Sequence, residues 1–222
     1  MKYPVHIEDW VAWTADSGLS IRPGHALTER LNESILPRML RRRLNATGRA
    51  VCDAASVLDD GAGSPLIHAS RHGDVSSSLE MLQGLESGDP VSPSSFSMSV
   101  HNAVLGVYSI ARQHRGPTQA LAACGNEFEA LITEAAGYLA TGQHAVIAIF
   151  SEGEIPLPLQ SHTESPLCPC VVALRLTSET GQRLLAEPTV AAARPTPLQV
   201  IDWLSQDHTA LVARHRWFLE RL

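Results

Sequence analysis

The chain has 222 residues, of which 44% are apolar and 18% are charged, and its 17 basic and 23 acidic residues give a net charge of −6. This composition is typical of a chain that buries a core, and it excludes an intrinsically disordered protein. The acidic balance excludes a general nucleic-acid binder held by phosphate charge, while it leaves room for one local basic patch.

The sequence does not predict secretion, a membrane span or a metal centre. The N-terminal segment MKYPVHIEDWVAW lacks the apolar stretch of a signal peptide, and no run approaches the roughly 18 apolar residues of a membrane span. Four cysteines are too few for a disulfide framework in a chain this long. The ten histidines are scattered, and the one local cluster, Cys168-Pro-Cys170 with His162, is a weak metal motif. We therefore expect a cytoplasmic protein without a bound metal.

The first half of the chain predicts two strands and two helices. A short strand is expected over residues 5–13, followed by a loop. Apolar residues at helical spacing predict one helix over residues 37–58. A short apolar run predicts a buried strand over residues 65–70. Asp74 can cap a second helix, which Gly88-Asp-Pro90 ends.

The second half continues the alternation of helices and strands. Pro93 is expected in a loop, and the segment 152–169 reads as irregular. Helices are expected over residues 98–112, 126–139 and 197–222, the last broken near residues 207–209, and strands over residues 119–124, 145–150 and 170–177. The pattern predicts an α/β fold with a mostly parallel five-stranded sheet covered by helices on both faces.

A stretch in the middle of the chain is recognisable. Ser99-Val-His-Asn-Ala103 is followed by Gly116-Pro117, a small-residue strand, and a helix that ends at Gly142. In this order and spacing the stretch resembles the N-terminal half of β-ketoacyl synthases, which have the thiolase fold. It is most similar to short chain-length-factor-like proteins of fatty-acid, polyketide or aryl-polyene-type systems. The resemblance implies one domain over residues 1–222, with a thiolase-like half at 1–178 and a helical extension at 179–222.

The resemblance also implies where a catalytic nucleophile would stand. Condensing enzymes of the family carry a cysteine at a sharp turn between a strand and a helix. Counting from Gly116-Pro117 and back from Gly142 puts Gly125 at that position, one residue after Cys124. A slip of one residue along a strand turns a side chain to the opposite face, so Cys124 is expected in the core, where cysteine behaves as a small hydrophobe. The alternative is a reactive Cys124 thiol supported by a bulge.

Other residues around this turn follow from the same resemblance. Ala123 and Asn126 would flank the turn, and Phe150 stands where the family has paired glycines. His101 would lie near the pocket and the dimer interface, either as a functional residue or as a hydrogen-bonded histidine at a helix end. About 45 residues follow Thr177, which is too few for the second half that carries the family's two catalytic histidines.

Two surfaces are candidates for partners. The basic run over residues 38–43 could dock an acidic acyl carrier protein through Arg38, Arg41 and Arg42, or it could be a solvated helix face. The resemblance implies that the strand of residues 119–124 pairs with a twin across a two-fold axis. Gln119 and Leu121 on that strand, and Val100 and Val104 beside it, would then form the interface.

These features lead to three hypotheses on function. The leading one is a non-condensing, chain-length-factor-like subunit that pairs with itself or with a ketosynthase-type chain. It would bind no cofactor of its own and would meet acyl-phosphopantetheine presented by an acyl carrier protein. The second is a small acyltransferase or thioesterase with Cys124 as nucleophile. The third is a homodimeric structural module without an acyl ligand.

Overall fold

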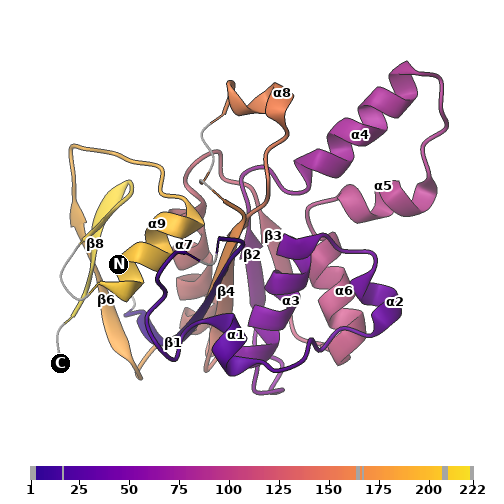
Figure 1. The fold of residues 1–222 in the computed structure, drawn as a ribbon. Coiled ribbons are helices and arrows are strands. Elements are labelled where there is room, and N and C mark those ends of the chain that lie inside the picture. The colour runs from indigo at the N-terminus through magenta and orange to yellow at the C-terminus, as the bar shows by residue number, and fades with distance from the viewer. Residues whose placement is uncertain (1–3, 17, 164–165, 167, 207–209, 221–222) are drawn as a thin grey trace.

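A mixed β-sheet runs through the middle of the molecule, with helices on both of its faces (Figure 1). The computed structural model describes residues 4–16, 18–163, 166, 168–206 and 210–220. Eight strands follow one another across the sheet in the order β3-β2-β4-β5-β1-β6-β8-β7. Their bounds are β1 His6–Thr14, β2 Leu66–Ala69, β3 Thr118–Leu121, β4 Val146–Glu152, β5 Cys170–Thr177, β6 Gln182–Pro188, β7 Leu211–Val212 and β8 His215–Leu219.

The α/β fold with helices on both faces is confirmed, while the size and direction of the sheet differ from the prediction. Within the described residues, the β3–β2 and β2–β4 pairs are parallel, and the other five strand pairs are antiparallel. The three additional strands come from the C-terminal extension, which was expected to be helical. Helix α9, Pro197–Ser205, ends well before residue 222, and β7 and β8 follow it. The break expected at residues 207–209 lies outside the described residues.

Two pairs of helices cover the two faces of the sheet (Figure 1). On one face lie α3, Ala46–Leu58, and α6, Ala103–Arg112; on the other lie α7, Glu127–Ala140, and α9. Successive side chains of a strand point to opposite faces, so β4 supplies both cores. Ile147 and Ile149 pack on the α3 side, whereas Val146 and Phe150 pack on the α7 side. Shorter helices are α1 Leu27–Arg30, α2 Arg38–Arg41, α5 Pro93–Ser99 and α8 Leu157–Gln160.

Two predicted helices prove to be interrupted. The helix expected over residues 37–58 is a single turn, α2, followed by α3. The Asn45 side chain accepts a hydrogen bond from the Gly48 N–H at 2.8 Å and begins α3. The helix expected from residue 98 is divided at Val100, whose extended backbone ends α5 before α6 begins. Pro93 lies at the start of α5 rather than in a loop, because proline is tolerated in the first helical turn.

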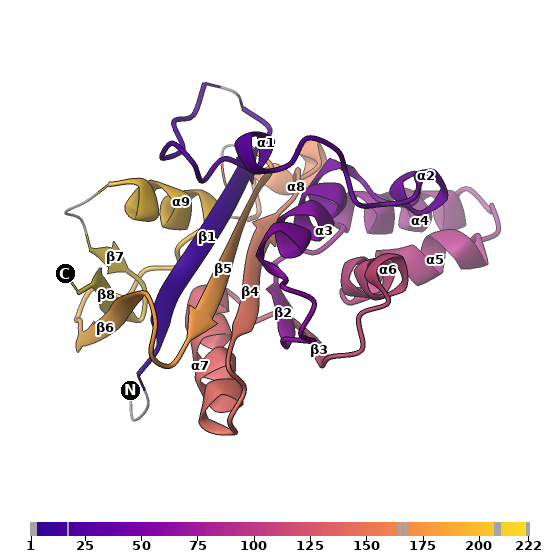
Figure 2. The ribbon, with the colours of Figure 1, turned by 90° about the horizontal axis from the view of Figure 1, so that it is seen from below.

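The segment between β2 and α6 forms an arm that extends beyond the end of the sheet (Figures 1 and 2). The arm consists of α4, Val75–Glu86, and α5, and neither helix has a buried residue. Three large apolar side chains of the arm are exposed, Leu82 at 63%, Leu85 at 54% and Phe96 at 60%. Figure 2 shows β3, at one end of the sheet, on the same side as the arm.

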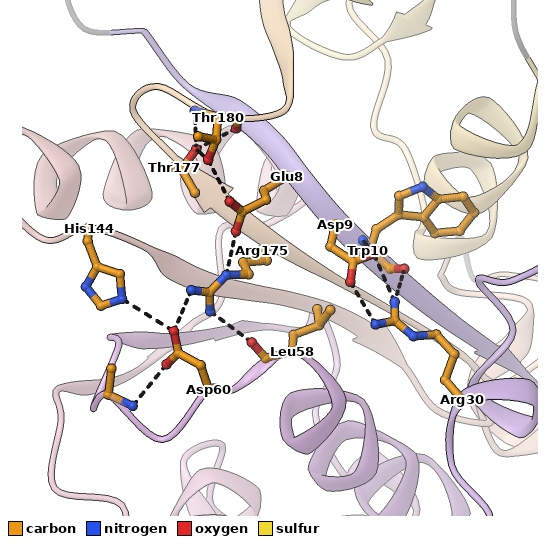
Figure 3. A network of polar contacts seen from close by, with 11 residues as sticks. Glu8, Asp9, Trp10, Arg30, Leu58, Asp60, His144, Arg175, Thr177 and Thr180 are labelled. Atoms are coloured by element: carbon orange, nitrogen blue, oxygen red, sulfur yellow. Dashed lines mark hydrogen bonds and ion pairs between the residues drawn. The ribbon is translucent and has the colours of Figure 1, made fainter.

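A network of charged groups joins β1, β5 and the end of α3 (Figure 3). The Arg175 guanidinium donates to Glu8 at 2.7 Å, to Asp60 at 2.7 Å and to the Leu58 carbonyl oxygen at 3.0 Å. Hydrogen bonds from the Thr180 hydroxyl and from Arg175 lower the pKa of Glu8. The pKa of Asp60 is also lowered, first by the Ala62 backbone N–H and then by Arg175. Arg175 pairs in register with Ile147 near the amino end of β4. The network therefore lies at the end of the sheet where β4 begins.

Candidate functional site

The carboxyl ends of β2, β3 and β4 meet at one edge of the sheet because the three strands are parallel. Ligand sites of open α/β sheets form at this edge. Here the segments that follow the strands are joined by ion pairs and hydrogen bonds. The Arg71 guanidinium lies 3.3 Å from a Glu127 carboxylate oxygen, and His72 Nδ1 lies 3.1 Å from Glu152. The Arg71 backbone N–H also donates to Glu152.

The turn between β3 and α7 carries the residues predicted to surround the nucleophile. Cys124 and Gly125 both have left-handed backbone conformations, with φ of 52° and 101°. The Gly125 N–H donates to Glu127 at 2.8 Å, and the fully buried Glu127 in turn binds Arg71. Ala123 accepts from the Asn126 N–H at 3.0 Å across the turn, and Asn126 stands at the start of α7.

Cys124 is exposed, so the prediction that it is buried in the core is wrong. That prediction extended the strand to residue 124 and counted alternating faces along it. Strand β3 ends at Leu121, so the turn geometry decides where the thiol points. Among the described residues, no hydrogen bond joins the Cys124 sulfur to a histidine or another base.

Gly125 is buried, and the space beside it is occupied by an arginine side chain. A Cβ atom built on Gly125 would lie 2.5 Å from Arg194 Cδ and 3.0 Å from Arg194 Cγ. Such a contact is too short, so any side chain at residue 125 requires Arg194 to move. Arg194 lies 69 positions further along the chain, in the extension before α9. The position that the resemblance assigns to the nucleophile therefore has no reactive group, and the space beside it is filled by the Arg194 side chain.

Histidines come together on the opposite face of β2 from the α7 core. His68 Nε2 lies 2.8 Å from the Ser151 hydroxyl oxygen, and the ring centroids of His68 and His101 are 5.7 Å apart. Both rings line a pocket of about 40 Å³. Burial lowers the pKa of His68 to about 3, and burial also lowers the pKa of His101, against the attraction of Glu127. Both imidazoles are therefore neutral at pH 7.

Sequence reasoning singled out His101 and missed His68 and Ser151. The available signal was a histidine within the apolar run of residues 65–70, because a buried polar side chain needs a partner. Phe150 was expected near the turn and the pocket. The structure places it in the core on the α7 side with 2% exposure, and it does not line the histidine pocket.

The basic run does not form one helical face, because α2 is a single turn. Arg38, Arg41 and Arg42 are all exposed. Arg42 lines a cleft of about 530 Å³ between α2 and the arm, whereas Arg41 lines a separate hollow of about 360 Å³ beside α1. Arg43, directly after the predicted docking residues, lines both the cleft and the histidine pocket.

The residues predicted for the interface gather around an unpaired edge. β3 is the terminal strand of the sheet, so one side of it has no partner strand within the described part of the chain. Gln119 and Leu121 on β3 are half-buried, Val100 is 44% exposed, and Val104 is half-buried beside the histidine pocket.

Neither a metal cluster nor a membrane-spanning helix is found within the described ranges. No group of three or more metal-binding side chains comes together there, and Cys170 of the Cys-x-Cys motif is buried. No helix described is long and apolar enough to cross a membrane.

Comparison with known proteins gives a family and several related structures. A model of the β-ketoacyl synthase N-terminal domain matches residues 10–217. The search of curated proteins finds no match to this sequence. A solved chain titled ketosynthase ApeO in complex with its chain length factor ApeC, from Xenorhabdus doucetiae, is 25% identical. It has a TM-score of 0.77 over 98% of this chain and 99% of that chain.

Two further structures share the fold. The ishigamide ketosynthase/chain length factor is 13% identical, with a TM-score of 0.57 over 84% of this chain and 68% of that one. A β-ketoacyl synthase from Burkholderia phymatum STM815 is 15% identical, with a TM-score of 0.57 over 83% of this chain and 63% of that one. The family match spans most of the sequence, so the resemblance and the thiolase-like α/β fold are confirmed: the chain belongs to the β-ketoacyl synthase N-terminal domain family.

Proposed function

We propose that this chain is a non-condensing, chain-length-factor-like subunit that pairs with a ketosynthase-type chain. The observation that carries the proposal is the turn at Gly125. A decarboxylative condensation needs a covalent acyl carrier on the enzyme, and the nucleophile position here is a glycine packed against Arg194. The 25% identical chain from a ketosynthase–chain length factor complex supports this role, because the two chains match over almost their whole lengths.

The surface around β3 suits a partner of the same fold. The unpaired edge of β3 offers backbone hydrogen bonds, and its sequence, TQAL, has no lysine, glutamate or proline to block pairing. The arm and α6 lie at the same end of the molecule as β3 (Figure 2), and both carry exposed large apolar side chains; these are Leu82, Leu85, Phe96, Val100 and Ile110. Exposed apolar patches of this kind mark protein interfaces. We therefore place the ketosynthase partner across the β3 edge and the arm.

The carrier protein is proposed to bind near α2. Arg38 and Arg42 are exposed cations in an acidic chain, and Arg42 and Arg43 line the cleft of about 530 Å³ beside the arm. An acyl carrier protein is acidic and bears a phosphopantetheine phosphate, which arginine binds well. In this proposal acyl-phosphopantetheine arrives on the carrier, and the pathway is of fatty-acid, polyketide or aryl-polyene type.

Affinity purification from the native host tests the pairing. A tagged chain should co-purify with a ketosynthase-type chain, identified by mass spectrometry. The complex should condense an acyl-carrier thioester with a malonyl-carrier thioester, whereas the purified chain alone should not. A purified chain that condenses these substrates by itself contradicts the proposal, and a pure homodimer that never captures a ketosynthase favours the structural-module hypothesis.

The second hypothesis, a thioesterase or acyltransferase, rests on the exposure of Cys124 next to α7. Alkylation of the folded protein should reach Cys124 before Cys52 and Cys170, because burial raises the pKa of both buried thiols. The deciding variant is Cys124→Ala. We expect it to keep partner binding and the activity of the complex. Loss of thioester hydrolysis in Cys124→Ala, with folding retained, would instead support the second hypothesis.

A further inference from the structure

The hollow beside α1 is lined by two arginine side chains that have no partner within the described residues. Arg41 is exposed at the end of α2, and Arg49 is half-buried on α3. Both line the hollow of about 360 Å³, and neither guanidinium makes a hydrogen bond or an ion pair in the described part of the chain. A guanidinium binds a carboxylate strongly, often through two parallel hydrogen bonds. The charge of the hollow therefore favours an anion.

Asp53 also lines the hollow, but neighbouring groups of the chain engage its carboxylate. Its Oδ1 accepts a hydrogen bond from the Ser34 hydroxyl at 2.8 Å and from the Ile35 N–H at 3.3 Å. These bonds join the segment after α1 to α3, so this wall of the hollow is held in place without a ligand. Two arginines and one aspartate leave the hollow with a net positive charge.

The rest of the lining of the hollow is largely apolar. Leu27 of α1 and Ala50 of α3 are buried there. Trp13, near the end of β1, and Leu31, which follows α1, are half-buried. An indole ring and leucine side chains favour an apolar or aromatic group over a hydrated ion. The volume lies within the range of roughly 300–1,000 Å³ that is usual for small-molecule sites.

We propose that the hollow beside α1 binds a small organic acid, with its carboxylate on Arg41 and Arg49 and its apolar body against Trp13. A bare inorganic anion would leave the apolar lining uncovered, and a neutral apolar molecule would leave both guanidinium groups without a partner. The site goes beyond the proposed function, because Arg38 and Arg42, the arginines proposed to dock the carrier protein, do not line this hollow. It needs neither the carrier protein nor a ketosynthase partner.

Calorimetric titration of the purified full chain tests this site without any partner. The probes are phenylacetate, phenylacetamide, which has the same shape and no charge, and acetate, which has the charge and no ring. Phenylacetate should bind saturably, and the other two probes should bind at least about 5-fold more weakly, because each lacks one half of the interaction. Added salt should weaken the binding of phenylacetate, since salt screens partly exposed charges.

Two variants and a matched control locate the binding site. Arg41→Gln and Arg49→Gln should each weaken phenylacetate binding about 3- to 10-fold. Arg41 is exposed, so its replacement tests the site even if Arg49→Gln disturbs the packing of α3. The control is Arg115→Gln, which removes the same charge from an exposed position before β3 that does not line the hollow. It should leave phenylacetate binding unchanged.

Several results would overturn the proposal. They are the absence of saturable binding, equal affinities for phenylacetate and phenylacetamide, unaltered affinity in both hollow variants, and equal weakening by Arg115→Gln. Saturating phenylacetate should also leave carrier-protein binding unchanged. Displacement of the carrier protein would instead assign the hollow to an acidic protein surface and would overturn the proposal. Failure of ketosynthase pairing would leave all of the titrations with phenylacetate unaffected.

Discussion

The glycine at the nucleophile position can be tested by adding a single methyl group. Gly125 has φ of 101°, a conformation that costs an L-residue about 1–2 kcal/mol. The new Cβ of Gly125→Ala would also lie 2.5 Å from Arg194 Cδ. Because Arg194 is exposed, its side chain can move aside, and this steric part should cost about 0.5 kcal/mol or less. We therefore expect Gly125→Ala to destabilise the fold by about 1–2 kcal/mol.

The assay is chemical and thermal unfolding of four proteins. They are the wild type, Gly125→Ala, the double variant Gly125→Ala with Arg194→Ala, and Gly137→Ala. For a chain of this size the expected loss in Tm is roughly 2–8 °C. Adding Arg194→Ala to Gly125→Ala separates the two causes, since it relieves the contact and leaves the backbone strain. The matched control is Gly137→Ala in α7, where a Cβ would meet nothing within 4 Å and φ is helical. That control should stabilise the protein by about 0.5–1 kcal/mol, because alanine favours helix.

The outcomes discriminate between explanations of the turn. If Gly125→Ala is neutral or stabilising, the turn does not require a glycine, and the argument that residue 125 is a structural glycine is wrong. If Arg194→Ala restores full stability, the constraint is the arginine contact alone. The expected result, a loss that Arg194→Ala restores only slightly, identifies residue 125 as a structural glycine at the family's reactive position.

Two further predictions concern charged groups. Arg175→Met should destabilise the fold by about 1–2 kcal/mol at pH 7, after allowance for solvent at the partly exposed Glu8 and Asp60. Both carboxyl pKa values are lowered in the folded state, so the part of this contribution that comes from the carboxylates is present above the unfolded pKa values near 4 and is lost as the pH falls through the folded values. The hydrogen bond to the Leu58 carbonyl oxygen does not depend on pH, so a difference from wild type that is as large in urea unfolding at pH 2 as at pH 7 contradicts the prediction. Separately, Arg38→Glu with Arg42→Glu should weaken carrier-protein binding in a fluorescence titration, and wild-type binding should fall with salt; insensitivity to both would leave a solvated surface.

The sequence predicted those elements whose pattern allows one interpretation. The apolar runs of β4 and β5 and the alternation of strands with helices place the sheet and both of its helix layers. The end of the chain was ambiguous because LVARHRWFLERL fits a helical period as well as a strand. Pairing of β8 with β6, about thirty residues earlier in the sequence, decides between them, and no local signal reports such a contact.

Some features of the candidate site were predictable from the sequence, and others depend on contacts between distant residues. The resemblance located the turn at Gly125, since Gly116-Pro117 and Gly142 fix its position from both sides. The exposure of Cys124 was not predictable from alternation, because the strand ends three residues before it. The pairing of His68 with Ser151 joins residues 83 positions apart, and the contact of Arg194 with Gly125 depends on the path of the extension. Contacts of that range come from tertiary packing.

The free edge of β3 provides the sharpest test of partner binding, because its hydrogen-bond directions are known. The Leu66 N–H donates to Pro117, and the Ser70 N–H donates to Leu121. In a parallel ladder the groups of alternate residues point to the same neighbour, so Gln119 also faces β2 while the Ala120 N–H points outward. A proline at residue 120 removes a hydrogen bond to a partner and leaves the ladder with β2 intact.

We expect Ala120→Pro to fold with a Tm near that of wild type and to lose its partner, whether that is a ketosynthase-type chain or a second copy. Sedimentation of the purified chain and co-purification from the host measure this directly. The matched control is Gln119→Pro, one residue away, which removes a donor to β2 and should lower the Tm of the chain itself. Leu121→Lys is less clean, because Leu121 is half-buried against the core on the α7 side. If Ala120→Pro assembles as wild type does, the β3 edge is not the interface, and the exposed apolar side chains of the arm must bind the partner without it.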